Sequence, residues 1–189
     1  ITDNKNNIII QSDKITYNIK KEIISSLGDT YANLQNKYEI KSTELVHNKN
    51  NMEIYSSKKS KIEDRLGNIF ELESFKFNIN EKLLKAKNIT MFDTKNNKYN
   101  LENSLVNLNT NEIVGSDISI DFDNSLFGNK KNEPRLKGRS LISNENESII
   151  YKGSFTTCKK NKDKCPPWTI LAGEVKHKKV EKIIEYRNA

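Results

Sequence analysis

Two cysteines and two histidines are the residues of this chain whose chemistry is most distinctive. Six residues separate Cys158 from Cys165, which is wider than the spacing of two to four usual for structural zinc. The spacing therefore favours a disulfide over a zinc site that would also use His47 and His177. A polar, turn-compatible insert and a Pro-Pro pair after Cys165 suit a local disulfide in an oxidising compartment. Two reduced cysteines in a cytosolic protein are the alternative.

Catalytic constellations are scarce. His47 follows Leu45, and His177 follows Val175, in one shared strand pattern, which predicts half-buried or edge histidines rather than bases or ligands. The sequence has no glycine-rich phosphate loop, no strand-turn-helix nucleophile motif and no well-placed pair of carboxylates. We therefore expect neither an enzyme nor a cofactor.

Short alternating apolar runs, bounded by Asn, Asp and Gly turns, predict that β-strands carry these residues. Only the segments 30–36 and 81–86 suggest helical turns. The runs that alternate are 8–10, 15–19, 38–40, 52–54, 75–79, 118–122 and 183–186.

Several strands end in one repeated pattern, in which an apolar residue, any residue and a second apolar residue precede Asn or Asp. Copies at 15–18, 45–48 and 75–78 begin 30 residues apart. An aromatic-x-aliphatic pattern precedes some strands, and Trp168 occupies its aromatic position. Each repeat predicts a strand pair closed by an Asx turn. One pair cannot bury its apolar face alone, so the pairs must stack into an antiparallel sheet or two facing sheets.

The same pattern predicts one domain over residues 1–189. Its interruptions are a loop at 123–134 and a cysteine-bearing insertion at 158–167. The apolar stripe has two interpretations, a thin packed core or the lining of a groove for acyl chains between splayed sheets. Both give the same alternation.

Charge and length restrict the class of protein. The net charge is +7, but 25 acidic residues are interleaved with 32 basic ones, which argues against a nucleic-acid-binding stripe. A mildly basic surface suits an anionic partner such as a phosphorylated lipid. No run approaches the ~20 apolar residues of a membrane-spanning helix, and the N-terminus has no signal-peptide core. We expect a soluble chain, compatible with a mature or trimmed piece of an exported protein.

The C-terminal third resembles a known family. The run YKGSFTTC at 151–158, the CPPW at 165–168 with Ile170 and Ala172 after it, and the final IEYRNA resemble the periplasmic part of the LptD family of outer-membrane lipopolysaccharide assembly proteins. The insert resembles the alphaproteobacterial branch of that family. The earlier strand pairs resemble the repeated units of the OstA-like domain shared by LptA, LptC and LptD, so the resemblance covers most of the chain.

That resemblance implies an all-β, open, twisted antiparallel β-jellyroll, or β-taco. It implies a non-enzymatic lipid-transport module that receives lipopolysaccharide in a hydrophobic groove and passes it towards an outer-membrane barrel. The location would be the periplasm, with attachment to the outer membrane in the full-length protein. Expected partners are the lipid A acyl chains of lipopolysaccharide, an LptA-like periplasmic bridge joined by edge-strand addition, and the barrel with its lipoprotein plug, but no nucleic acid.

In that family, cysteines of this domain bond to cysteines of the barrel. Cys158 and Cys165 match them, and a bond between the two is equally open. A stand-alone LptA-like bridge and a structural or adhesive β-solenoid with a closed core are the competing functions. On the groove interpretation the lining consists of Ile15, Tyr17, Leu45, Phe75, Phe77, Ile89, Met91, Ile118, Ile120, Phe122 and Val175.

Overall fold

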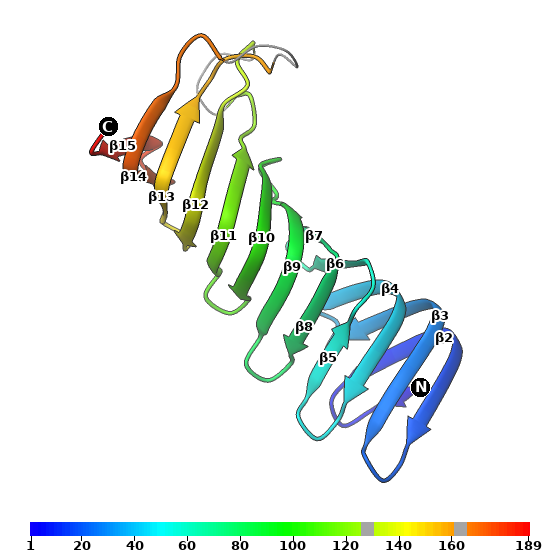
Figure 1. Ribbon diagram of the computed structural model, residues 1–189. Coiled ribbons are helices and arrows are strands. Elements are labelled where there is room, and N and C mark those ends of the chain that lie inside the picture. The colour runs from blue at the N-terminus through cyan, green and yellow to red at the C-terminus, as the bar shows by residue number, and fades with distance from the viewer. Residues whose placement is uncertain (126–130, 161–165) are drawn as a thin grey trace. The chain divides into compact units, whose positions relative to one another are not determined.

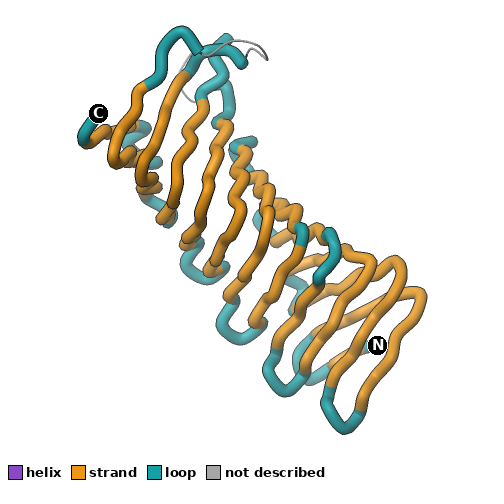
Figure 2. Tube along the Cα trace, viewed as in Figure 1, coloured by secondary structure: helices purple, strands orange, loops and turns teal. Residues whose placement is uncertain are grey.

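Fifteen β-strands and no helix make up the part of this computed structural model that is described, residues 1–125, 131–160 and 166–189 (Figures 1 and 2). Every strand pairing within each of its two compact units, Ile1–Thr94 and Lys95–Ala189, is antiparallel. The predicted all-β antiparallel class is confirmed, and the parallel coils of a β-solenoid are not what these pairings form. A single domain over 1–189 stays a prediction. No helix that could cross a bilayer occurs in these residues.

Unit 1 contains nine strands. Their hydrogen-bonded order is β1-β2-β3-β4-β5-β8-β9, while β6 pairs with β4 and β7, and β7 also pairs with β9. The strands are β1 (Thr2–Asp3), β2 (Ile8–Asn18), β3 (Ile23–Leu34), β4 (Tyr38–Asn48), β5 (Glu53–Ser56), β6 (Ser60–Asp64), β7 (Ile69–Leu72), β8 (Ser74–Asn78) and β9 (Leu83–Phe92).

Long strands of unit 1 bend at mid-length and so belong to two walls. β4 pairs with β6 through residues 38–42 and with β5 through residues 46–48. We call the half that contains β6 and β7 the first wall and the half that contains β5 and β8 the second wall. Register shifts in β2 and β3 mark the bend, because an extra residue kinks a strand.

Gly28 occupies this bend for a steric reason. Its φ is +91°, and a Cβ built there would lie 2.2 Å from Oδ2 of Asp13. The same Oδ2 accepts the backbone N–H of Asp29 at 2.9 Å. A side chain at position 28 would therefore displace the carboxylate that ties the two bent strands together.

Unit 2 contains the remaining six strands, hydrogen-bonded in sequence order. Pairing is interrupted in mid-strand near Asp117 and Lys152, whose φ values are 49° and 50°, so these strands also have two halves. We call the half with residues 118–121 the first wall of unit 2 and the half with β15 the second wall. The strands are β10 (Lys98–Asn107), β11 (Glu112–Asp121), β12 (Arg135–Ser143), β13 (Glu147–Thr156), β14 (Ile170–Lys178) and β15 (Ile183–Arg187).

The predicted Asx turns are confirmed. At the end of β4, Oδ1 of Asn48 accepts the backbone N–H groups of Asn50 and Asn51 at 3.1 and 3.3 Å. Such bonds satisfy turn amides that have no ladder partner. The same arrangement closes strand pairs at Asn18, Asn78, Asn107 and Asn144.

The predicted helical turns are wrong. Residues 30–34 continue β3, and residues 83–86 begin β9. In both segments the backbone pairs with a neighbouring strand, as Thr30 does with Ser42 and Leu84 does with Phe77. Tertiary pairing outweighs weak local helical spacing there.

Candidate functional site

The interior of unit 1 lies between its two walls and is lined mainly by apolar side chains. On the second wall one row of side chains runs across adjacent strands, each directly opposite the next. All of its members are at most 4% exposed. In strand order the row is Ile24, His47, Ile54, Phe77 and Leu84.

The two walls of unit 1 touch each other. The Tyr38 ring from the first wall meets the Phe77 ring from the second wall edge to face, with centroids 5.3 Å apart. Both side chains are buried. The interior is therefore filled by side chains of the opposing walls, held in the edge-to-face geometry that aromatic pairs prefer.

Polar side chains connect the free ends of these walls. The Lys82 ammonium donates to Oε1 of Gln35 and lies 6.0 Å from the Tyr38 ring centroid. Burial, together with Lys37, lowers the pKa of Lys82. Lys49 lies 4.0 Å from Asp3 of the first wall and 3.5 Å from Glu22 of the second. These contacts are between side chains, which can exchange partners more readily than a backbone ladder.

Unit 2 has an interior of the same kind with a different composition. Leu141, Ile150 and Val175 lie opposite one another on its second wall and are fully buried. Phe122 approaches from the other half of the sheet, and its ring centroid lies 5.3 Å from that of His177. The walls of unit 2 therefore also meet through their inward side chains.

Most of the predicted groove residues face these interiors. Ile15 is half-buried, and Tyr17 is 41% exposed with its hydroxyl donating to Glu22 at 2.8 Å. Both lie on β2, which ends the row on the second wall. The role of all eleven predicted residues as a lipid lining stays a prediction. The other nine, all at most 7% exposed, are Leu45, Phe75, Phe77, Ile89, Met91, Ile118, Ile120, Phe122 and Val175.

Sequence reasoning missed other inward residues of the same rows. They follow the same alternation as Phe77 and Val175. The sequence did not identify them because the residues opposite them cannot be assigned until the pairing of the strands is known. They include Ile24, Ile54, Leu84, Leu136, Leu141 and Ile150.

Both histidines are more deeply buried than the strand pattern predicted. His47 is fully buried, its Nδ1 lies 3.2 Å from the Glu53 carbonyl oxygen, and its Nε2 has no hydrogen-bond partner among the described residues. Burial lowers the pKa of His47. Burial, with smaller effects of Lys179 and Lys95, lowers the pKa of His177 to about 4. Both imidazoles are therefore neutral at pH 7, and no cluster in the described chain has the composition of a metal site.

Cys158 lies just beyond β13. The Thr156 hydroxyl donates to the Trp168 carbonyl oxygen at 2.8 Å and accepts the Cys158 backbone N–H at 3.2 Å. Hydrogen bonding of the Cys158 side chain to Thr156, with smaller effects of Trp168 and Arg135, lowers the pKa of the Cys158 thiol. Residues 161–165 of the predicted insertion, which include Cys165, lie outside the described residues. The disulfide therefore stays a prediction.

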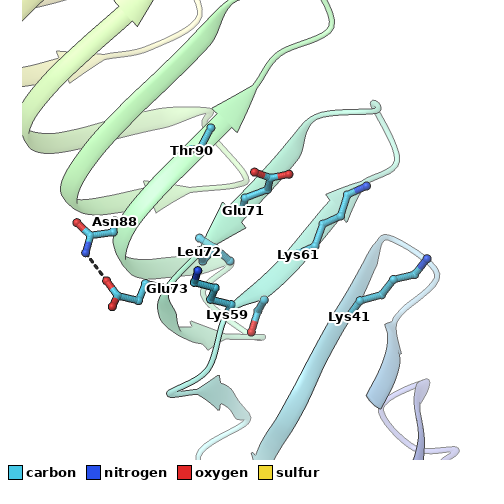
Figure 3. A pocket seen from close by; sticks show the side chains of 9 residues that line it. Lys41, Lys59, Lys61, Glu71, Leu72, Glu73, Asn88 and Thr90 are labelled. Atoms are coloured by element: carbon cyan, nitrogen blue, oxygen red, sulfur yellow. Dashed lines mark hydrogen bonds between the residues drawn. The ribbon is translucent and has the colours of Figure 1, made fainter. Parts of the chain in front are cut away.

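A polar hollow of about 700 Å³ lies on the outer side of unit 1. Figure 3 shows Lys41, Lys59 and Lys61 among its lining residues, together with Glu71 and Glu73. A second hollow of about 670 Å³ shares Lys41 and Lys59. The mixture of charges makes this surface unlike an acyl-chain site, which is predominantly apolar.

No protein-family model and no curated protein sequence matches this chain. Among solved structures it is similar to LptH from Pseudomonas aeruginosa, described as the LptA homologous periplasmic component of the conserved lipopolysaccharide transport device. The match has a TM-score of 0.49 and 13% sequence identity, and it covers 57% of this chain and 80% of LptH.

Proposed function

We propose that this chain is a non-enzymatic lipid-transport module that accepts lipopolysaccharide acyl chains between the walls of its units. The observation that carries the proposal is the buried apolar row of the second wall, which faces a first wall joined to it across the free ends by side chains. Separation of the walls exposes apolar surface and leaves the backbone hydrogen bonds between the strands of each wall intact. An acyl chain could then replace the side-chain contacts that are lost between the walls.

The magnitude favours hydrocarbon as the ligand. Each methylene that is fully desolvated contributes about 0.8 kcal/mol. An aromatic pair such as Tyr38–Phe77 contributes only about 1 kcal/mol beyond its buried area. A few methylenes therefore offset the specific contact that is lost when these two rings separate.

The finer proposal is the periplasmic domain of an LptD-type protein, with its cysteines near the exit of the lipid path and an outer-membrane barrel and lipoprotein plug as partners. The resemblance of residues 151–189 to that family supports it. β15 ends the hydrogen-bonded order of strands, and such an edge is suited to adding a strand from an LptA-like bridge. A stand-alone periplasmic bridge would use the same edge and the same interiors.

Site-specific photo-crosslinking in cells tests the proposal. Crosslinkers at the inward positions Phe77 and Ile120 should capture lipopolysaccharide, because both side chains are at most 1% exposed and face the interiors. Lys76 and Ser119 are the matched controls, since each precedes its partner in the same strand and points to the other face. Labelling confined to Lys76 and Ser119 would contradict an interior path.

A further inference from the structure

The second wall of unit 2 carries a row of polar side chains, whereas the matching row of unit 1 has isoleucines on both sides of its histidine. Ser143, Ser148 and His177 lie opposite one another on β12, β13 and β14. They are 3%, 2% and 8% exposed. In unit 1, His47 takes the place of His177 in the strand pattern, and its neighbours in register are Ile24 and Ile54.

These polar groups belong to the interior face. Ser143 and Leu141, Ser148 and Ile150, and His177 and Val175 are two residues apart on their strands. Alternate residues of a strand share a face. The polar row therefore lies directly beside the fully buried apolar row Leu141, Ile150 and Val175.

A chain of hydrogen bonds begins at Lys179 and runs along this row. The Lys179 ammonium donates to Oγ of Ser143 at 2.9 Å. Oγ of Ser143 and Oγ of Ser148 are 2.8 Å apart. An ammonium that donates to Ser143 polarises that hydroxyl and favours it as the donor to Ser148. The Ser148 hydroxyl hydrogen is then left to point onward into the interior that it shares with His177.

The row thus offers donors rather than charge. The imidazole of His177 is neutral at pH 7, since its pKa is about 4, and a neutral imidazole has one N–H donor. Donors beside a hydrocarbon-lined row match a group that has acceptor oxygens and is attached to an alkyl chain. The carbonyl of a fatty acyl ester has this composition, because it accepts hydrogen bonds and donates none.

We propose that Ser148 and His177 bind the carbonyl oxygen of a fatty acyl ester, while Ser143 and Lys179 position the Ser148 hydroxyl. The acyl chain would lie on Leu141 and the rest of the apolar row. This inference rests on the proposed lipid function and deepens it by assigning the acyl linkage, rather than hydrocarbon alone, to unit 2. It makes the matching histidine-containing rows of the two units chemically different binding surfaces.

Calorimetric titration of the full chain with two lipids tests the site. Monomyristoyl glycerol carries the ester carbonyl, and tetradecyl glycerol ether has a chain of similar length without it. The native protein should bind the ester more tightly. Ser148→Ala should weaken ester binding about fivefold to tenfold, the worth of one net hydrogen bond, and change ether binding less than about twofold.

Ser56→Ala is the matched control. Ser56 is likewise buried, and its Oγ lies 3.1 Å from another serine hydroxyl, that of Ser42 in unit 1. This variant should leave the preference for the ester unchanged. The infrared carbonyl stretch of an isotope-labelled ester should move to lower frequency on binding the native protein and less so on binding Ser148→Ala.

The outcomes separate the two levels of the proposal. If neither lipid binds the native protein, the lipid function and the carbonyl site both fail. If both lipids bind but Ser148→Ala weakens them equally, or weakens neither, the lipid function stands and the carbonyl site is refuted. Loss of the ester preference in Ser56→Ala would also refute it, because the effect would then be one of general stability.

Discussion

Acid should destabilise unit 2 through His177, a buried side chain that must stay neutral in the folded protein. Its pKa falls from the ordinary 6.5 to about 4, chiefly through burial and secondarily through Lys179 and Lys95. The folded state therefore binds this proton less readily than the unfolded state does. Stability is fully present above pH 6.5 and is lost as the pH falls from 6.5 towards 4.

The size of the loss follows from the two pKa values. The difference between 6.5 and about 4 is about 2.5, and each pKa unit corresponds to about 1.4 kcal/mol. The free energy of unfolding should therefore fall by about 3 kcal/mol between neutral pH and pH 4 from this residue alone. That is a large part of the roughly 5–15 kcal/mol typical of a folded domain.

Urea unfolding of native protein and His177→Gln measures this loss. Glutamine keeps a neutral polar side chain but cannot titrate, so carboxylates and His47 contribute almost equally to both proteins. Trp168, the single tryptophan, lies in unit 2 with its ring centroid 6.3 Å from that of Phe155, so its fluorescence reports on the relevant unit. The native protein should lose about 3 kcal/mol more than the variant by pH 4. Equal losses in the two proteins would refute the reasoning.

Three further predictions concern unit 1. Gly28→Ala should lower the free energy of unfolding by about 2 kcal/mol or more in urea titrations, because φ is +91° and the new Cβ would meet Asp13; an unchanged midpoint would contradict the steric account. Asn48→Ala should cost about 1 kcal/mol in the same assay, since two turn amides lose their acceptor, whereas the neighbouring exposed Asn50 changed to Ala should cost less. Phe77→Ala should cost about 3–5 kcal/mol by removing a fully buried ring, and a loss below 1 kcal/mol would show that position 77 is not packed as described.

Sequence alternation predicted the strands and many inward positions but not the change of phase at the bend of strands such as β4. In β4, Ile40 and Ser42 face inward in one half, and Leu45 and His47 face inward in the other. The step from 42 to 45 is odd, so no single alternation describes the whole strand. The extra residue at this bend lies in the paired strand β3, between Leu27 and Thr30, and the buried positions of β3 keep one parity. The position of the bend, and with it the change of faces in β4, depends on pairing with neighbouring strands, which one chain segment does not reveal.

Tyr17 shows a second limit of sequence reasoning. It shares the pattern of Phe77, and it lies opposite Ile24 in register. Phe77 has neighbours on both sides, Ile54 and Leu84, and is 1% exposed, whereas Tyr17 is 41% exposed. β2 is paired over residues 14–18 with β3 alone among the described strands. Burial therefore depends on the position of a strand in the sheet as well as on side-chain type.

The two histidines connect these structural details to the proposed function. Each ends an inward strand segment after a buried aliphatic residue, Leu45 or Val175, so the repeat places both imidazoles in matching interior positions. Their neighbours in register differ, because His47 lies between two isoleucines while His177 lies between Ser148 and Ile184. A core that served only stability would gain more from apolar residues at such buried positions, since buried polar groups are costly without partners. Under the proposal above, the serine beside the imidazole in unit 2 binds a polar group of a ligand, and the matching histidine of unit 1 has isoleucines in place of that serine.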